Sequence, residues 1–224
     1  MLSDDNRKLE SGSPRSHSSA EVEVLLRENA LIRLGGVKMT SCEYNDFPCQ
    51  NPRYDDFDKI ARYELLKPIE ADVLLNNSEF CMVIPIDETQ IIGDMDHKLF
   101  LKTLRGQAGL YHLWVDHDAC TDHNTHTMLC AYVGKGPPEG RIASHVKNRW
   151  PGAVQLFATF TPMENRMAKY YEQLFLDCYE FILNKAENRG KNKLYAVWDD
   201  ERYTVGTHLN EVSGLSGIQS FDDY

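Results

Sequence analysis

Short apolar runs of strand type recur along the chain between polar segments. The run Phe80–Ile84 predicts one strand, and residues 109–115 and 125–134 predict two more. The polar residues 116–124 join the latter two, which predicts an antiparallel hairpin with a long tip. Residues 154–160 predict a further strand that follows the hairpin.

Helical patterns fill the stretches between these runs. Apolar positions at helical spacing predict helices over 20–34, over about 56–66 and over 141–150. A fourth helix is expected to run from Pro162 past Glu172 to about Phe181. Its expected start is a capping box, with Thr161 as N-cap and Glu164 at the third helical position.

The order of these elements predicts an α+β fold, with a small central antiparallel or mixed β-sheet flanked by helices and a mainly helical N-terminal extension. Residues 1–20 are rich in serine and charge and predict a disordered tail. We expect an accessory region over 21–98, a core domain over 99–190, and a C-terminal hairpin and tail over 191–224. The expected C-terminal hairpin pairs Leu194–Trp198 with Arg202–Thr207.

Composition narrows the class of protein. The 224 residues are 42% hydrophobic and 26% charged, and no stretch approaches the roughly 20 apolar residues of a membrane helix. The N-terminus lacks the apolar run of a secretory signal, and six cysteines without a CxxC pair predict reduced thiols. We therefore expect a cytoplasmic protein with no membrane partner.

Charge is distributed unevenly along the chain. The formal net charge is −10, which argues against a polyanionic partner if the charge is evenly spread. Residues 131–193, however, hold 10 basic and 6 acidic residues, whereas residues 1–100 hold 11 basic and 19 acidic ones. A phosphate-binding site is therefore compatible with the middle of the chain.

Four motifs in this middle segment occur in a fixed order. They are Gly109-Leu110-Tyr111, Tyr132-Val133-Gly134, the pair Arg141 and His145, and the pair Glu172 and Asn184. Their spacing and order resemble the GIY-YIG nuclease family over about residues 99–190, and most closely the type II restriction endonucleases of that family. The resemblance implies a GIY-YIG nuclease fold and metal-dependent hydrolysis of DNA phosphodiester bonds.

The residue types suit this chemistry. Arg141 and His145 are four residues apart on one predicted helix, so both side chains can address the same phosphate. Glu172 is a hard oxygen ligand for one Mg²⁺ or Mn²⁺ ion per active site. The resemblance makes Tyr111 the general base or water-orienting group and Tyr132 a phosphate contact or a support for Tyr111. His145 is the alternative base, because the ordinary histidine pKa of about 6.5 suits that task.

Further residues are expected to contact the substrate. Lys135 follows the second triplet directly, and Lys147 and Arg149 lie on the predicted helix of Arg141. Asn184 can reach the site if its helix ends before it, because twelve residues of continuous helix would turn it about 120° away from Glu172. The expected partner is DNA, and a homodimer would let one active site per chain cut both strands.

The segment 116–130 offers a second chemistry. Cys120, His123, His126 and Cys130 could supply four Zn²⁺ ligands, although the spacing matches no zinc finger that we can name. The sequence thus leaves two functions open. One is a restriction-type or toxin/effector-type endonuclease, the latter exported by a route other than Sec. The other is a zinc-stabilised, non-catalytic module that binds nucleic acid or protein.

Overall fold

The computed structural model describes residues 49, 52–78, 80–84, 101, 104–148, 150 and 154–206. The expected tail over 1–20 and the expected helix over 20–34 lie outside these residues. All structural statements below concern the described part of the chain.

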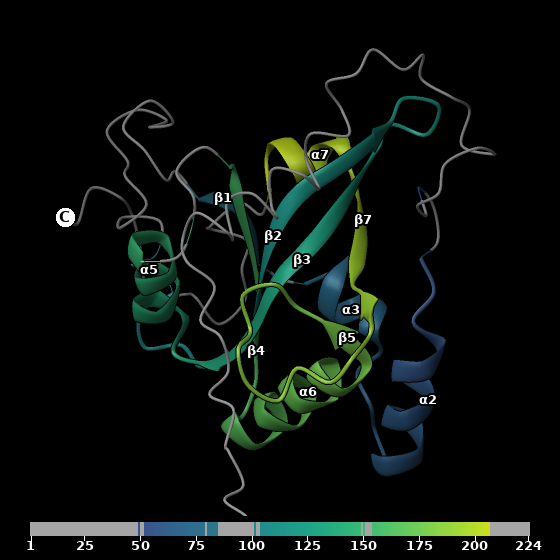
Figure 1. Ribbon diagram of the computed structural model, residues 1–224, viewed down its shortest axis with the longest axis vertical. Coiled ribbons are helices and arrows are strands. Elements are labelled where there is room, and N and C mark those ends of the chain that lie inside the picture. The colour runs from purple at the N-terminus through teal and green to yellow at the C-terminus, as the bar shows by residue number, and fades with distance from the viewer. Residues whose placement is uncertain are drawn as a thin grey trace, which may run out of the picture.

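A five-stranded antiparallel sheet forms the centre of the molecule (Figure 1). Its strand order is β1-β4-β2-β3-β7, and each neighbouring pair is antiparallel. The strands are β1 (Phe80–Ile84), β2 (Gly109–Cys120), β3 (Thr125–Gly136), β4 (Leu156–Pro162) and β7 (Tyr195–Asp199). Helices flank this sheet, so the expected α+β class is confirmed. The two edge strands, β1 and β7, come from outside residues 99–190.

Strand β2 lies in the middle of the sheet and is buried on both faces. Its residues alternate between two hydrophobic cores, with Leu110 and Trp114 in one core and Tyr111 and Leu113 in the other. All four side chains are fully buried. A strand segment covered on both faces has little need for polar positions, which explains the mostly apolar sequence of residues 109–115 in the first half of β2.

Helices cover each face of the sheet. Residues of α2 (Asp55–Glu64), α3 (Ala71–Leu75) and α6 (Asn165–Cys178) enter the core that contains Trp114, whereas α5 (Pro138–Asn148) contributes Ile142 to the core that contains Tyr111. A separate two-stranded parallel pair joins β5 (Tyr179–Glu180) to β6 (Asn192–Lys193).

Aromatic contacts fix α6 against α2. Phe175 of α6 stacks on Phe57 of α2 with ring centroids 4.3 Å apart, and both rings are fully buried. The hydroxyl of Tyr171 accepts a hydrogen bond of 2.6 Å from the backbone N–H of Ile69. Each buried phenylalanine contributes about 1.5–3 kcal/mol through burial of apolar surface, so these contacts hold α6 firmly in place.

The hairpin formed by β2 and β3 differs from the expectation at its tip. Residues 116–120, expected in the loop, continue strand β2, and only residues 121–124 form the turn. Asn124 takes a positive φ of 53°, which asparagine tolerates better than most residues. The antiparallel hairpin is confirmed, but the long polar tip is wrong, because polar residues here form strand pairs with β3.

The start of α6 also differs from the expectation. Thr161 and Pro162 belong to β4, where they pair with Leu110 and Gly109 of β2. The N-cap of α6 is Glu164, whose side chain makes no capping hydrogen bond. The expected capping box is therefore wrong, because sheet pairing extends β4 through the residues that resemble a helix start. The helix ends at Cys178, three residues before the expected end.

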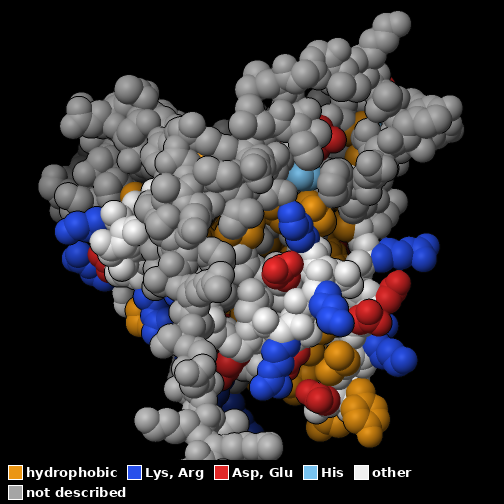
Figure 2. Space-filling model, in the orientation of Figure 1, with side chains coloured by type: hydrophobic (Ala, Val, Ile, Leu, Met, Phe, Trp, Pro, Cys, Tyr) orange, Lys and Arg blue, Asp and Glu red, His pale blue; other side chains and the backbone are white. Residues whose placement is uncertain are grey.

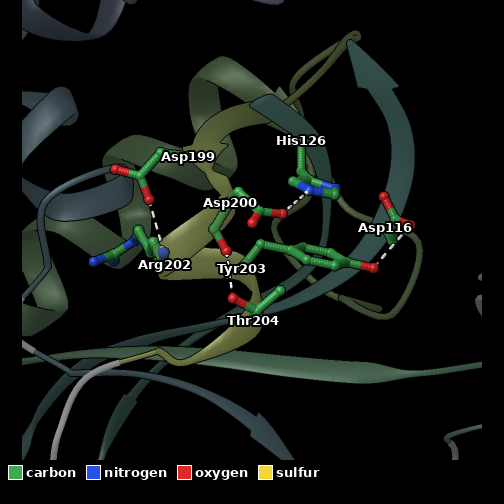
Figure 3. Close-up of polar contacts among 7 residues, drawn as sticks. All are labelled: Asp116, His126, Asp199, Asp200, Arg202, Tyr203 and Thr204. Carbon is green, nitrogen blue, oxygen red and sulfur yellow. Dashed lines mark hydrogen bonds and ion pairs between the residues drawn. The ribbon is translucent and has the colours of Figure 1, made fainter. Parts of the chain in front are cut away.

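The C-terminal hairpin is replaced by a strand and a helix. Strand β7 is present as expected, but residues Asp200–Thr204 form the short helix α7 instead of a second strand. The Asp199 carboxylate accepts a hydrogen bond of 2.7 Å from the backbone N–H of Arg202 (Figure 3). Asp199 is therefore an N-cap, and this local bond favours a helical turn over an extended strand.

The surface carries both charge signs in close mixture. Figure 2 shows Lys and Arg side chains interspersed with Asp and Glu side chains over the lower part of one face. No helix among the described residues has the length and apolar character needed to cross a bilayer.

Candidate active site

The two glycine-tyrosine motifs lie side by side on β2 and β3. Tyr111 pairs with Gly134, and Leu113 pairs with Tyr132, so the two tyrosines occupy diagonal positions on neighbouring strands. Their ring centroids are 5.9 Å apart. Tyr111 is fully buried, whereas Tyr132 is partly exposed.

Gly134 is required by the packing of Tyr111. A Cβ atom at position 134 would lie 2.6 Å from both Cζ and the hydroxyl oxygen of Tyr111, and 2.6 Å from a ring carbon of Tyr132. Carbon atoms do not approach each other this closely, so only glycine leaves room for the first tyrosine. Gly134, the last residue of the second triplet, thus leaves the space that Tyr111, the last residue of the first triplet, occupies.

Gly109 has a similar steric reason. A Cβ atom there would lie 2.1 Å from the backbone oxygen of Thr161 on β4. Both strands would have to separate to accommodate a side chain. The two glycines of the motif pattern are therefore fixed by close approach of backbone and ring atoms.

Helix α5 brings His145 and Arg141 to the tyrosines. The His145 ring lies 4.2 Å from the Tyr132 ring, centroid to centroid, and His145 is 7% exposed. Arg141, one turn earlier on α5, is exposed. Its positive charge acts on both Tyr111 and Glu172. Ile142, between them in sequence, is buried and anchors the helix to the sheet.

Glu172 approaches the same region from α6. Its carboxylate is half-buried, and the backbone N–H of Lys135 favours the ionised form of that carboxylate. Burial raises the pKa of Glu172, while the positive charges of Lys135 and Arg141 counteract part of that increase. The Glu172 carboxylate thus feels the positive charges of Lys135, which follows the second triplet, and of Arg141.

Burial dominates the environment of the Tyr111 hydroxyl. It raises the pKa of Tyr111 well above the ordinary tyrosine value, and the neighbouring Tyr132 raises it further, whereas Arg141 lowers it. Neither neighbour makes a hydrogen bond of good geometry to this hydroxyl, which has no such partner among the described residues. In the protein alone, burial therefore outweighs the lowering effect of Arg141 on the Tyr111 pKa.

Asn184 lies near the tyrosines but contacts the backbone of β3. Its amide oxygen accepts a hydrogen bond from Val133 N–H, and its amide nitrogen donates one to Val133 C=O. Helix α6 ends at Cys178, before Asn184. This end is needed for Asn184 to lie near the site, because a continued helix would turn it away from Glu172. A direct contact with substrate stays a prediction for Asn184, and also for Lys147, which is exposed on α5. Arg149 lies outside the described residues.

The structure assembles only half of the expected Zn²⁺ ligand set. Cys120 and His123 lie together at the hairpin turn, and they are joined by Cys49 instead of His126 and Cys130. The distance between His126 Nε2 and the Asp200 carboxylate is 3.4 Å, and the His126 ring stacks on Tyr203 with centroids 3.6 Å apart (Figure 3).

Cys130 is excluded from that ligand set by its place in the fold. Its thiol is buried in the core and faces the backbone oxygen of Tyr132 at 3.4 Å. Sequence spacing could not identify Cys49 as a neighbour of the turn, because it lies 71 residues before Cys120.

Comparison with known proteins adds no relative. No protein-family model, no curated protein and no solved structure matches this chain.

Proposed function

We propose that the protein is a divalent-metal-dependent endonuclease of the GIY-YIG type that hydrolyses DNA phosphodiester bonds. The observation that carries this proposal is the convergence of β2, β3, α5 and α6 on one site. The converging residues are Tyr111, Tyr132, Arg141, His145 and Glu172. The steric need for glycine at position 134 adds support, because it links the last position of the second triplet to the placement of Tyr111.

The Glu172 carboxylate is a hard oxygen donor of the kind that a divalent cation prefers. Glu172 is a half-buried carboxylate, and an Mg²⁺ or Mn²⁺ ion bound through one carboxylate keeps most of its water molecules. Burial raises the Glu172 pKa in the protein alone, and a bound cation would favour the ionised carboxylate. When bound, the ion would polarise the phosphoryl oxygen and stabilise the leaving oxygen.

The side chains of the chain itself supply the remaining groups. The exposed Arg141 guanidinium can donate two parallel hydrogen bonds to a phosphate. Tyr132 is partly exposed and its ring makes a tilted contact with the His145 ring, so its hydroxyl is suited to a hydrogen bond with the same phosphate. Because burial raises the Tyr111 pKa, the Tyr111 hydroxyl stays neutral and orients the attacking water. His145 accepts the proton that this water loses.

Plasmid cleavage with Mg²⁺ or Mn²⁺ tests this proposal. We expect Glu172→Ala and Arg141→Ala to lose about 100-fold or more of the cleavage rate, and Arg141→Lys to be impaired as well. Glu180→Ala and Arg62→Ala are matched surface controls on β5 and α2 and should cleave normally. Full activity in Glu172→Ala or Arg141→Ala would exclude the proposed chemistry.

Two further measurements define the reaction. The pH–rate profile should lose its limb near the histidine pKa in His145→Gln and keep it in Tyr111→Phe; the reverse would make Tyr111 the base. Mapping of cleavage products separates a restriction-type enzyme, which yields discrete fragments, from a toxin/effector-type enzyme, which yields a smear. Sedimentation with DNA tests whether a homodimer makes the double-strand cut.

The group formed by Cys49, Cys120 and His123 favours a second candidate function, a zinc-stabilised binding module without catalysis. Its signature would be about one Zn²⁺ per chain together with no cleavage of duplex DNA, branched DNA or RNA.

A further inference from the structure

Two cysteines and a histidine converge at the turn end of the hairpin of β2 and β3. The sulfur atom of Cys120 lies 3.5 Å from Nδ1 of His123, and the sulfur atom of Cys49 lies 3.6 Å from the same nitrogen. All three ligand atoms lie within 4.8 Å of one another.

These distances match the ligand spacing of a tetrahedral zinc site. With Zn–S of about 2.3 Å and Zn–N of about 2.0–2.1 Å, a tetrahedral angle puts sulfur and nitrogen about 3.6 Å apart. Hydrogen bonding alone explains the arrangement less well. An imidazole Nδ1 has one lone pair or one hydrogen in the ring plane, so it cannot form two linear hydrogen bonds to two sulfur atoms.

We propose that Cys49, Cys120 and His123 bind a structural Zn²⁺ ion. Thiolate and imidazole ligands in a tetrahedral arrangement select Zn²⁺ over the hard cations Mg²⁺ and Ca²⁺. Cys49 is 8% exposed and Cys120 is 6% exposed, so the ligands are shielded as in a structural site. Zinc takes four ligands, and these three residues leave the fourth position to water or to another donor.

Neighbouring groups already hold the three ligands together without the ion. The hydroxyl of Thr125 donates a hydrogen bond of 2.7 Å to the backbone oxygen of Cys49. The short turn over 121–124, with its positive φ at Asn124, reverses the chain so that His123 returns to Cys120. The site is therefore built by the hairpin turn and receives Cys49 from a segment distant in sequence.

The ion would act as a cross-link and not in phosphodiester hydrolysis. Nine residues of strand β2 separate Tyr111 from Cys120, which corresponds to about 30 Å. The zinc site thus lies at the opposite end of β2 from the candidate active site. Its existence does not depend on the proposed nuclease function, and Glu172→Ala should retain the zinc.

Metal analysis of the full chain tests the proposal. Protein purified without chelator should contain about one Zn²⁺ per chain. Cys120→Ser, Cys49→Ser and His123→Ala should each lose most of it. Cys178→Ser and His126→Gln are matched controls, a half-buried cysteine on α6 and a histidine beside the turn, and should keep it. Protein that stays metal-free when supplied with Zn²⁺, or equal losses in the controls, would overturn the proposal.

Thiol alkylation of the wild-type chain covers the case in which the variants fail to fold. Zn²⁺ should slow alkylation of Cys49 and Cys120 at least about tenfold and leave Cys178 unchanged, because a bound thiolate is a poor nucleophile. X-ray absorption should show at least two sulfur neighbours at about 2.3 Å. A disulfide between Cys49 and Cys120 in protein purified under reducing conditions, or absence of sulfur neighbours, would contradict a zinc site.

Discussion

The Asn184 side chain forms two hydrogen bonds with the backbone of Val133, one accepted at 3.1 Å and one donated at 2.9 Å. Strand β7 pairs with β3 only as far as Leu129, and no other strand of the described residues pairs with the β3 edge at Val133. The Asn184 amide takes the place of that strand for one residue. Because Val133 directly follows Tyr132, the contact also fixes the second tyrosine.

Asn184→Ala should therefore reduce the free energy of unfolding by about 1–3 kcal/mol, since it leaves a buried N–H and C=O of Val133 without partners. Urea denaturation measures this loss. Asn77→Ala, an exposed asparagine at the end of α3, is a control that should cost less. Unchanged stability combined with weakened DNA binding would instead indicate that Asn184 contacts the substrate.

Gly134→Ala should displace the Tyr111 ring, because the new methyl group would lie 2.6 Å from the ring carbon and the hydroxyl. We expect a loss of about 1–3 kcal/mol in stability from the overpacking, and loss of cleavage. Gly140→Ala on α5 is the matched control. A Cβ atom there meets nothing within 4 Å, and alanine in a helix is favoured by up to about 1 kcal/mol. Equal effects of the two substitutions would refute the packing role of Gly134.

Burial of Glu172 predicts that this residue costs stability at neutral pH. Its pKa is higher in the folded chain than in the unfolded chain, so its contribution is most favourable below the ordinary glutamate pKa and is lost as the pH rises. Glu172→Gln should thus be at least as stable as wild type at pH 7, and the difference should shrink toward pH 4. Denaturation at both pH values measures this. A variant that is clearly less stable at pH 7 would show that the carboxylate has a structural role.

The burial of His112 predicts that the folded chain loses stability on mild acidification. Complete burial against Phe175 and Trp114 lowers its pKa to about 3, so the folded state holds it neutral while the unfolded chain takes up a proton below about pH 6.5. The contribution of His112 to the free energy of unfolding is therefore fully present above about pH 6.5 and decreases as the pH falls. At pH 5 the loss amounts to up to about 2 kcal/mol. His112→Phe should lose less stability between pH 7 and pH 5 than wild type. Parallel pH profiles would contradict this assignment.

The sequence alone identified the features that depend on local pattern. The strand at Phe80–Ile84 and the hairpin follow from apolar runs, whereas the candidate site residues were expected from the resemblance of their motifs to a nuclease family. The predictions were wrong where contacts between residues distant in sequence, or a cap at the next element, decide the local structure. Pairing with β2 draws Thr161 and Pro162 into a strand, and the Asp199 cap turns the following residues into a helix. Cys49 could not be assigned to the hairpin turn, because only the folded chain brings it there.

Because β1 and β7 belong to the central sheet, the segment that carries the motifs does not contain the whole sheet. A fragment of residues 99–190 would lose both edge strands, as well as the buried rings of Phe57 and Trp198. Exposed strand edges over an open core promote aggregation. The motif-bearing segment is thus not a transplantable unit, and any fusion or recombination that preserves this site has to carry β1, β7 and helix α2 with it.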